Sequence, residues 1–330
     1  MKASVLVGTG VIEVRERPVP EPKPDEVLIR VAAVGVCGSD VHYYKHGRIG
    51  DFVVREPIVL GHEVSGRITG VGSTIAAGRI GERVAIEPQL PCRRCAQCKA
   101  GRYNLCPDMR FFATPPVDGA FCEYVTVPAD FAHPVPDAVS DTAAALLEPL
   151  SVGVWACRKA DVGTGSRVLV TGAGPIGLIA AQTARAAGAT EVIVSDPVPA
   201  RRTRVADFGF TAAEPAQVAE VSDVDALIEC SGAPPAIASG IPAVRGGGRI
   251  VLVGMGSDQL TLPVSLIQNR ELWLTGVFRY ANTWPTAIAL AASRSVELDR
   301  LVTGTFGLTD VEAALRADER PDAMKAVVIP

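Results

Sequence analysis

One stretch, residues 167–196, limits the fold more than any other part of the chain. A strand, a glycine-rich loop, a helix, a second strand and an acidic residue are predicted there in this order: Arg167–Thr171, Gly172-x-Gly174-x-x-Gly177, Pro175–Ala187, Glu191–Ser195 and Asp196. This order is the fingerprint of a dinucleotide-binding Rossmann unit, whereas an isolated glycine triplet is weak evidence. The sequence therefore predicts an α/β fold with a doubly wound parallel sheet in this region.

The glycines of the loop let the backbone approach a pyrophosphate, which binds at the helix N-terminus formed by Pro175 and Ile176. Asp196 lies about where an acidic residue binds the hydroxyls of the adenine ribose. A carboxylate there repels a 2′-phosphate, which favours NAD over NADP. Arg201, Arg202 and Arg204 oppose that preference, because a nearby arginine can accept the phosphate.

The whole chain is long enough for two domains, and its composition excludes several classes of partner. It has 330 residues, of which 48% are hydrophobic, and a formal net charge of −4 without a basic cluster, so no nucleic-acid partner is expected. No run reaches the roughly 18 apolar residues of a membrane span, and the N-terminus does not resemble a signal peptide. A cytoplasmic location is expected, where eight cysteines indicate metal binding or packing before disulfides.

A first candidate metal site combines Cys37, His62 and Glu63. A thiolate, an imidazole and a carboxylate are all zinc ligands, and three protein ligands leave the fourth tetrahedral position open for water or substrate. The alternative is a buried cysteine and an unrelated His-Glu pair on the surface. The flanking Cys-Gly-Ser-Asp and Gly-His-Glu turns favour a catalytic metal.

A second candidate metal site has the spacing C-x2-C-x2-C-x7-C, formed by Cys92, Cys95, Cys98 and Cys106. Four thiolates close a tetrahedral shell without an open position, so this site is predicted to be structural. Such a zinc ion would hold together a loop that lacks a core of its own.

Three motifs carry a family resemblance: the runs Cys37–Tyr43, Gly47–Gly50 and Leu60–Glu63. They resemble the zinc-dependent medium-chain dehydrogenases, and within them the sorbitol (polyol) dehydrogenases. The resemblance implies a GroES-like catalytic domain (1–148, with a structural zinc lobe at 92–106, completed by 279–330). It also implies a Rossmann NAD-binding domain (149–278), two zinc ions per chain and a homotetramer.

The resemblance also assigns roles to individual residues. The third ligand of the catalytic zinc is either Glu63 or Glu148, and the polyol pattern favours Glu63, with Glu148 touching the zinc-bound water. Ser39 and His42 would relay the released proton. The implied coenzyme contacts include Arg201, Val253, Phe278 and Arg279, and the implied substrate contacts are Tyr43, Phe52, Phe111, Thr114, Glu148, Arg279 and Tyr280.

The expected reaction is oxidation of a secondary hydroxyl of a sorbitol- or xylitol-type polyol to the ketose, with hydride transfer to NAD, and the reverse. A first alternative is the same fold acting on another secondary alcohol, a diol or threonine. A second is a non-catalytic NAD-binding protein with structural zinc only.

Several local expectations can be compared with the structure. Residues 1–33 predict a hairpin and a strand, Glu26–Val34, and the helix Asp141–Ala160 is expected to break near Glu148 because of Pro149. Residues 205–278 predict the strands Val224–Glu229 and Arg249–Val253 with the helix Pro234–Val244 between them. The segment between Gly209 and Asp225 is too short for the usual strand and crossover helix, so a short or missing helix is expected. The remainder predicts two helices and a last strand, Met324–Ile329.

Overall fold

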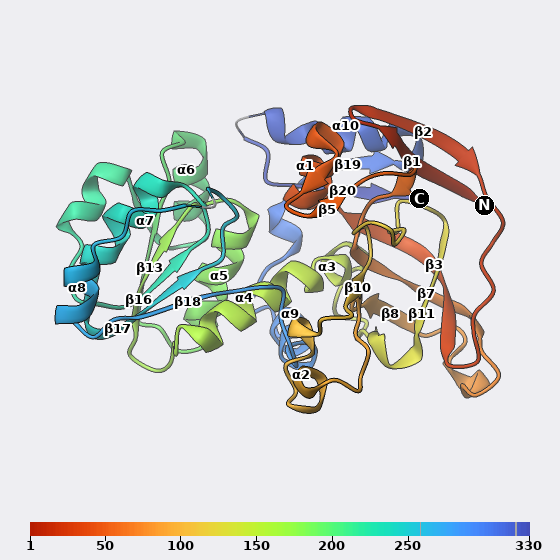
Figure 1. Ribbon diagram of the computed structural model, residues 1–330, viewed down its shortest axis with the longest axis horizontal. Helices are drawn as coiled ribbons and strands as arrows, with labels where there is room; N and C mark the ends of the chain where they lie inside the picture. The colour runs from red at the N-terminus through yellow and green to blue at the C-terminus, as the bar shows by residue number, and fades with distance from the viewer. Residues whose placement is uncertain (258, 321) are drawn as a thin grey trace. The chain divides into compact units, whose positions relative to one another are not determined.

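The computed structural model describes residues 1–257, 259–320 and 322–330 and contains two compact units. Unit 1 consists of Met1–Glu148 and Leu298–Pro330, and unit 2 consists of Pro149–Glu297 (Figure 1). Helix α4 (Leu147–Lys159) begins in unit 1 and continues in unit 2.

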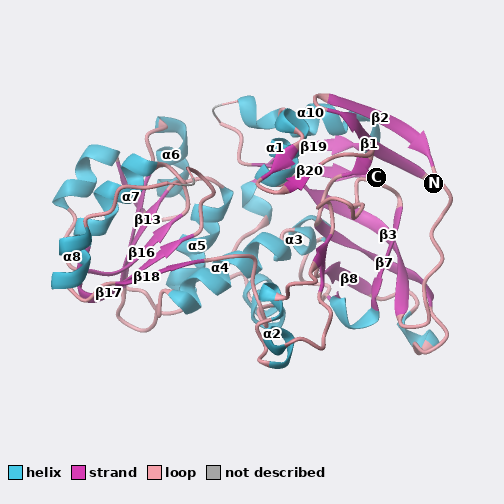
Figure 2. Cartoon of the chain, in the orientation of Figure 1, coloured by secondary structure: helices cyan, strands magenta, loops and turns pink. Residues whose placement is uncertain are grey.

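A seven-stranded sheet forms the centre of unit 1, with the order β12-β8-β7-β3-β20-β19 and β11 also paired with β3 (Figure 2). Its strands are β3 (Glu26–Gly35), β7 (Glu63–Val71), β8 (Arg83–Ile86), β11 (Tyr124–Pro128), β12 (Ala132–Pro134), β19 (Val302–Gly307) and β20 (Lys325–Ile329). Along β3 the buried residues Val27, Ile29 and Val31 alternate with more exposed ones, as expected for a strand with one face in the core. The expected β-rich GroES-like domain is confirmed.

The remaining elements of unit 1 are short. The N-terminal hairpin β1–β2 pairs with β6, as β1 (Lys2–Gly8), β2 (Val11–Glu16) and β6 (Ile58–Val59). Two two-stranded ribbons are β4 (Arg48–Ile49) with β5 (Phe52–Val53), and β9 (Gln89–Leu90) with β10 (Arg110–Phe111). The helices are α1 (Gly38–His46), α2 (Ala96–Lys99), α3 (Asp141–Ala145) and α10 (Val311–Leu315).

The expected break near Glu148 in the helix after Asp141 is present, and it lies at Leu146, between α3 and α4. Pro149 falls in the first turn of α4, where a helix needs no backbone N–H from it, so the proline begins the new helix instead of kinking an old one.

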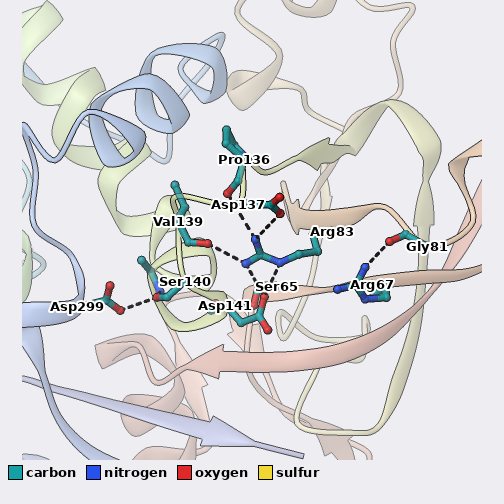
Figure 3. A network of polar contacts seen from close by, with 11 residues as sticks. Ser65, Arg67, Gly81, Arg83, Pro136, Asp137, Val139, Ser140, Asp141 and Asp299 are labelled. Carbon is teal, nitrogen blue, oxygen red and sulfur yellow. Dashed lines mark hydrogen bonds and ion pairs between the residues drawn. The ribbon is translucent and has the colours of Figure 1, made fainter.

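The start of α3 is fixed by a polar network (Figure 3). The Ser140 Oγ caps the helix by accepting a hydrogen bond from the Ala143 amide at 2.9 Å, and it donates one to Asp299 Oδ1 at 2.6 Å. The Arg83 guanidinium donates to Asp141 Oδ1 at 2.7 Å and to the Val139 carbonyl at 2.7 Å. The network thus joins α3 to β8 and to the C-terminal part of unit 1.

Unit 2 contains a parallel six-stranded sheet with the order β15-β14-β13-β16-β17-β18. Its elements are β13 (Arg167–Thr171), α5 (Pro175–Ala186), β14 (Glu191–Ser195), α6 (Pro199–Asp207), β15 (Thr211–Ala213), β16 (Val224–Glu229), α7 (Pro234–Gly240), β17 (Val244–Leu252), α8 (Val264–Asn269), β18 (Trp273–Gly276) and α9 (Trp284–Ala292). Counted from the first strand, this is the 3-2-1-4-5-6 order of the Rossmann fold, with the switch point between β13 and β16. The expected Rossmann domain is confirmed.

The expected shortening before β16 is also present. Between Gly209 and Asp225 the chain forms only the short strand β15 and one 3-10 helix, Pro215–Glu220. The buried side chain of Val218 from this short helix packs into the core with Leu227 and Ile237, so it covers the sheet in place of a full crossover helix.

Two parts of the C-terminal half differ from expectation. Strand β17 begins at Val244 instead of Arg249, and the preceding helix ends at Gly240, since Ile241–Ala243 forms a 3-10 turn. Strand β19 was not expected at all. Its sequence Val-Thr-Gly-Thr-Phe-Gly is only partly buried, and it becomes a strand by pairing in parallel with β20.

The return of the chain to unit 1 was expected at residue 279, but residues 279–297 belong to unit 2. Hydrogen bonds explain this later boundary. Arg158 on α4 donates to the Asn282 carbonyl at 2.8 Å and to Thr286 Oγ1 at 2.9 Å, and the Glu297 amide donates to Gln182 Oε1 at 2.8 Å.

None of the helices in the described part of the chain combines the length and the apolarity needed to cross a membrane.

Replacing the capping serine tests the network at α3. Ser140→Ala is expected to destabilise unit 1 by about 1 kcal/mol, because it removes a helix cap, and so to lower its melting temperature by about 2–4 °C. Differential scanning calorimetry measures this. The control is Ser73→Ala, which changes an exposed serine of unit 1; equal melting temperatures for the two variants would contradict the capping role.

Candidate active site

Three side chains that can bind a metal converge where two central strands of the unit 1 sheet, β3 and β7, respectively end and begin. One ligand atom each from Cys37, His62 and Glu63 lies within 4.8 Å of the others. Cys37 follows β3 and stands at the N-terminus of α1, whereas Glu63 is the first residue of β7. Because β3 and β7 are antiparallel with Gly35 opposite Glu63, the end of one strand and the start of the other meet. Sheet pairing therefore places the three ligands together.

Gly35 is required for this convergence. A Cβ atom at this position would lie 2.0 Å from Glu63 Oε2 and 3.0 Å from Leu146 Cδ2. Any side chain here would displace the carboxylate, so the glycine allows Glu63 to lie against the backbone of β3.

Asp40 orients two of the three ligands, and sequence reasoning missed it. Its buried carboxylate accepts hydrogen bonds from the amides of Cys37 and Gly61, both at 2.9 Å, and lies 3.6 Å from His62 Nδ1. This contact to Nδ1 leaves Nε2 of the imidazole for a metal ion. The only available signal was an acidic residue three positions after the cysteine.

The electrostatics of this pair favour the charged forms. Burial opposes ionisation of Asp40, but the neighbouring His62 and the two amides lower its pKa below the usual value. Burial likewise opposes protonation of His62, but Asp40 and Cys37 raise its pKa well above the usual value. A metal ion at this site therefore competes with a proton on His62.

A lysine that sequence reasoning also missed contacts Glu63. Lys325, the first residue of β20, donates from Nζ to Glu63 Oε1 at 2.5 Å and to the Val36 carbonyl at 2.7 Å. Burial lowers its pKa, but Glu63, Cys37 and Glu148 together raise it above the usual value, so the lysine is a cation.

The other oxygen of Glu63 has no hydrogen-bond partner within the described residues, although it is buried. A buried carboxylate oxygen without a partner is costly, and a metal ion would satisfy it. With a thiolate and an imidazole beside it, the donor set suits Zn²⁺. Glu148, the alternative third ligand, is buried on α4 but lies outside this ligand group.

The proposed relay residues lie on α1. Ser39 is half-buried two residues after Cys37, and His42 is exposed, with its ring centroid 4.6 Å from that of His46. Since residues three apart share one face of a helix, Ser39 and His42 form a series that leads from the ligand group to solvent.

The candidate substrate residues of unit 1 fall into two places. The Phe111 ring is buried against His62, with centroids 5.3 Å apart, and Tyr43 is buried on α1. Phe52 is 43% exposed and lines a cavity of about 440 Å³ with the Pro115-Pro116 pair, which directly follows Thr114. The structure thus connects Phe52 with the loop of Phe111 and Thr114.

The four cysteines of the C-x2-C-x2-C-x7-C motif in unit 1 come together in space, as their spacing predicts. One sulfur each from Cys92, Cys95, Cys98 and Cys106 lies within 4.8 Å of the others. Amide N–H groups donate to three of these sulfurs. Such donors lower the pKa of Cys92 to about 7, whereas burial raises that of Cys98 to about 12. A metal ion would keep all four as thiolates, and a closed tetrahedral zinc site fits this loop.

In unit 2 the glycine-rich loop has the conformation that its sequence predicts. Gly172 has φ +91°, Gly174 is the N-cap of α5, and Pro175 is in its first turn. A Cβ at Gly177 would lie 1.7 Å from the Gly172 carbonyl oxygen, so the loop and the helix need both glycines to pack. Ile176 is half-buried in the first turn.

Asp196 supports this loop from the end of β14. Its buried carboxylate accepts hydrogen bonds from the Ala173 and Val198 amides, both at 2.8 Å, and lies 3.8 Å from Arg201 Nη1. Arg202 forms an ion pair with Glu214 at 2.6 Å. Nε of Arg201 is buried and has no hydrogen-bond partner in the described part of the chain, so it remains available to a ligand.

The other candidate coenzyme residues follow the C-terminal ends of β17 and β18. Val253 is half-buried, and Phe278 is 52% exposed with the Arg279 guanidinium 4.7 Å from its ring centroid. Tyr280 is fully buried. This edge of a parallel sheet is where Rossmann folds bind dinucleotides. The roles of Arg279 and Tyr280 toward a substrate remain a prediction.

Glu229, a third residue that sequence reasoning missed, joins the loops at this edge. Its carboxylate is fully buried at the end of β16 and accepts hydrogen bonds from the Ser231 hydroxyl, the Ser231 amide at 2.7 Å and the Gly232 amide at 3.0 Å. A Cβ at Gly172 would lie 2.9 Å from the Ser231 nitrogen, and one at Gly254 would lie 2.1 Å from the Gly232 nitrogen. The turn held by Glu229 therefore packs directly against the two neighbouring loops.

Comparisons with known proteins agree with both units. Residues 23–137 match the family described as alcohol dehydrogenase GroES-like domain, and residues 175–293 match the family described as zinc-binding dehydrogenase. The sorbitol dehydrogenase of Bos taurus is 44% identical over 336 residues, which cover 98% of this chain and 94% of the relative. That of Bacillus subtilis is 42% identical over 343 residues, which cover 100% of this chain and 97% of the relative. The solved structure of L-idonate 5-dehydrogenase from Escherichia coli K-12 has a TM-score of 0.93 and 30% identity, and the match covers 100% of this chain and 98% of that one.

The fold and the ligand clusters define a zinc-binding dehydrogenase with a GroES-like and a Rossmann domain. More narrowly, the chain belongs to the sorbitol dehydrogenase family of the zinc-dependent medium-chain dehydrogenase/reductase superfamily.

Replacing Glu229 tests its role in coenzyme binding. In Glu229→Gln an NH₂ group replaces a carboxylate oxygen whose neighbours are hydrogen-bond donors from Ser231 and Gly232. At least one of these buried donors then loses its acceptor, which costs about 1–3 kcal/mol. We expect the Kd for NADH, measured by fluorescence titration, to rise at least about fivefold, which corresponds to about 1 kcal/mol, with zinc content unchanged. Glu220→Gln, at an exposed position of unit 2, is the control. A Kd equal to that of the control would exclude this role.

Proposed function

We propose that this protein is an NAD-dependent polyol dehydrogenase that oxidises a secondary hydroxyl of a sorbitol- or xylitol-type sugar alcohol to the ketose, and catalyses the reverse. The observation that carries the proposal is the group of Cys37, His62 and Glu63, in which a buried carboxylate oxygen lacks a partner among the described residues. The relatives named sorbitol dehydrogenase match over nearly the full chain and support a polyol as the substrate.

In this proposal unit 1 is the catalytic domain and unit 2 the coenzyme domain. When bound, zinc supplies Lewis acidity that lowers the pKa of the alcohol hydroxyl, and NAD accepts the hydride. Cys37, His62 and Glu63 hold the zinc, and Ser39 passes the released proton along α1 to His42. Phe111 packs on His62 and excludes water from that side of the site.

The remaining candidate residues orient the substrate. Tyr43, Phe52 and Thr114 border the polyol in unit 1, and Glu148 would accept a hydrogen bond from a water or a substrate hydroxyl beside the group that would hold the zinc. Arg279 and Tyr280 of unit 2 bind hydroxyls of the polyol. A second zinc ion would be held by the four-cysteine cluster and would fix the loop to which these cysteines belong, Cys92, Cys95, Cys98 and Cys106.

The coenzyme is NAD, because the carboxylate at the end of β14 disfavours a 2′-phosphate. Asp196 is held by two backbone amides, and one of the arginines that oppose this preference, Arg202, is already paired with Glu214. Arg201 and the loop from Gly172 to Gly177 bind the ribose and the pyrophosphate.

We also propose a cytoplasmic homotetramer. The structure describes all eight cysteines and none of them is in a disulfide, which fits a reducing compartment. Strand β18 ends the sheet of unit 2 and exposes 66% of Trp273 and 38% of Leu274. An exposed apolar edge strand is a template for pairing, so β18 supports an interface with the same edge of a second copy.

The proposed activity is tested with the zinc-loaded protein and a panel of four- to six-carbon polyols. We expect NADH formation at 340 nm with polyols of one stereochemical pattern, and at least tenfold lower kcat/KM with NADP. Cys37→Ser should lose the catalytic zinc and the activity together, whereas Cys122→Ser, which changes a thiol outside both clusters, should retain both zincs. Turnover of threonine or simple diols in place of polyols would transfer the proposal to the alternative substrates, and no turnover with one zinc per chain would favour a non-catalytic protein.

The proposed interface is tested at its most exposed residue. Trp273→Lys adds a charge to the edge of β18, where pairing with a second copy would bury it, so the assembly should dissociate to smaller species. Multi-angle light scattering measures the mass, and Met255→Lys, an exposed apolar position outside β18, is the control. A variant that keeps the mass of the unchanged protein would exclude this edge as an interface.

A further inference from the structure

We propose that Lys325 is a positioning residue that makes Glu63 a one-oxygen ligand of the catalytic metal ion. The inference rests on the proposed role of Cys37, His62 and Glu63 as metal ligands. It assigns a function at this site to the last strand of the chain.

The pairing of three strands brings the lysine to the carboxylate. In the order β7-β3-β20, Gly35 on the central strand lies opposite both Glu63 and Val327. Lys325 precedes Val327 by two residues, so its side chain is on the same face of the sheet. With no side chain at Gly35 to separate them, residues from the two outer strands meet over the central strand.

Lys325 contacts only one of the two carboxylate oxygens of Glu63, which leaves the other for a metal ion. Nζ is 2.5 Å from Oε1, whereas Oε2 is buried without a hydrogen-bond partner among the described residues, and one oxygen of this carboxylate lies in the ligand group. A carboxylate held in this way can offer a metal ion only Oε2, because Oε1 is engaged by the ammonium group. Glu63 is therefore fixed in one rotamer as a monodentate ligand.

The same ammonium group holds the chain beside the second ligand. Nζ donates to the carbonyl of Val36 at 2.7 Å, and the next residue is Cys37. One cation therefore positions a carboxylate from β7 and a thiolate from the end of β3. Hydrogen-bonded groups of this kind, one contact beyond the metal ligands, typically change metal affinity or activity 10–100-fold when removed.

Charge gives the lysine a second effect. A thiolate and a carboxylate together cancel the charge of Zn²⁺, which weakens it as a Lewis acid. The ammonium of Lys325 draws electron density from Glu63, and because it is only 5% exposed, salt and water screen it little. The rival explanation is a buried ion pair that stabilises the sheet and does nothing for the metal.

Metal binding separates these explanations. The variants are Lys325→Met, which removes the charge, and Lys325→Arg, which keeps it; Lys23→Met, at a lysine that forms a surface ion pair, is the matched control. The catalytic-site affinity for zinc is measured by chelator competition, with the zinc of the four-cysteine cluster as an internal reference. The Co²⁺-substituted proteins give the absorption bands of the ligand-field and thiolate transitions, which report the ligand sphere directly.

We expect Lys325→Met to weaken zinc binding at the catalytic site 10–100-fold and to shift the Co²⁺ bands, with the reference zinc unchanged. Lys325→Arg should restore affinity in part, and Lys23→Met should match the unchanged protein. If Lys325→Met binds zinc and Co²⁺ as the control does, the inference is wrong. If the unchanged protein binds only one zinc, the proposed catalytic site itself is wrong.

A double variant keeps the test decisive if Lys325→Met alone fails to fold. Glu63→Gln with Lys325→Met removes both buried charges, so neither remains unpaired. If the lysine acts through Glu63, adding Lys325→Met to Glu63→Gln should change metal affinity less than threefold. A further tenfold loss would show that the lysine acts mainly through its contact with Val36 beside Cys37, and would overturn its role as the residue that makes Glu63 a one-oxygen ligand.

Discussion

The antiparallel pairing of β3 with β7 determines where chemistry can occur in unit 1. It sets Gly35 opposite Glu63 and so brings together residues 37 and 63. A shift of this register by one residue would turn Glu63 to the other face of the sheet. The position of the candidate metal ligands is therefore a consequence of the sheet, and the short helix α1 adds Asp40, which orients two of them.

Buried carboxylates fix the conformation of loops in both units. Asp40, Asp196 and Glu229 are each almost fully buried and accept hydrogen bonds from backbone amides of a loop that follows a strand. Each loop would otherwise contain unpaired donors, and its conformation would not be fixed. A charged acceptor makes stronger bonds than a neutral one, which suits loops that must hold a metal ligand or a coenzyme in place.

The sequence predicted what depends on local patterns, and it missed what depends on distant pairing. Strands β13, β14 and β16 were placed to the residue, because β-branched runs, glycines and the acidic ends are local signals. The two cysteine-containing clusters followed from spacing and neighbouring turns. Strand β19 was missed because its residues are only partly buried and β20 alone makes it a strand. Lys325 was missed because 262 positions separate it from Glu63, and only the order of the sheet brings them together.

The arrangement around Glu63 links metal binding at this site to folding. Without a metal ion, the described part of the site holds a buried carboxylate oxygen without a partner and a histidine whose raised pKa favours a proton. The unpartnered oxygen opposes folding, and a divalent cation would remove this cost by pairing with it, in exchange for the proton on His62. The pairing of Lys325 with the other oxygen limits this cost in the metal-free state. The four-cysteine loop, by contrast, has little core of its own, so we expect its order to depend on a bound ion more directly.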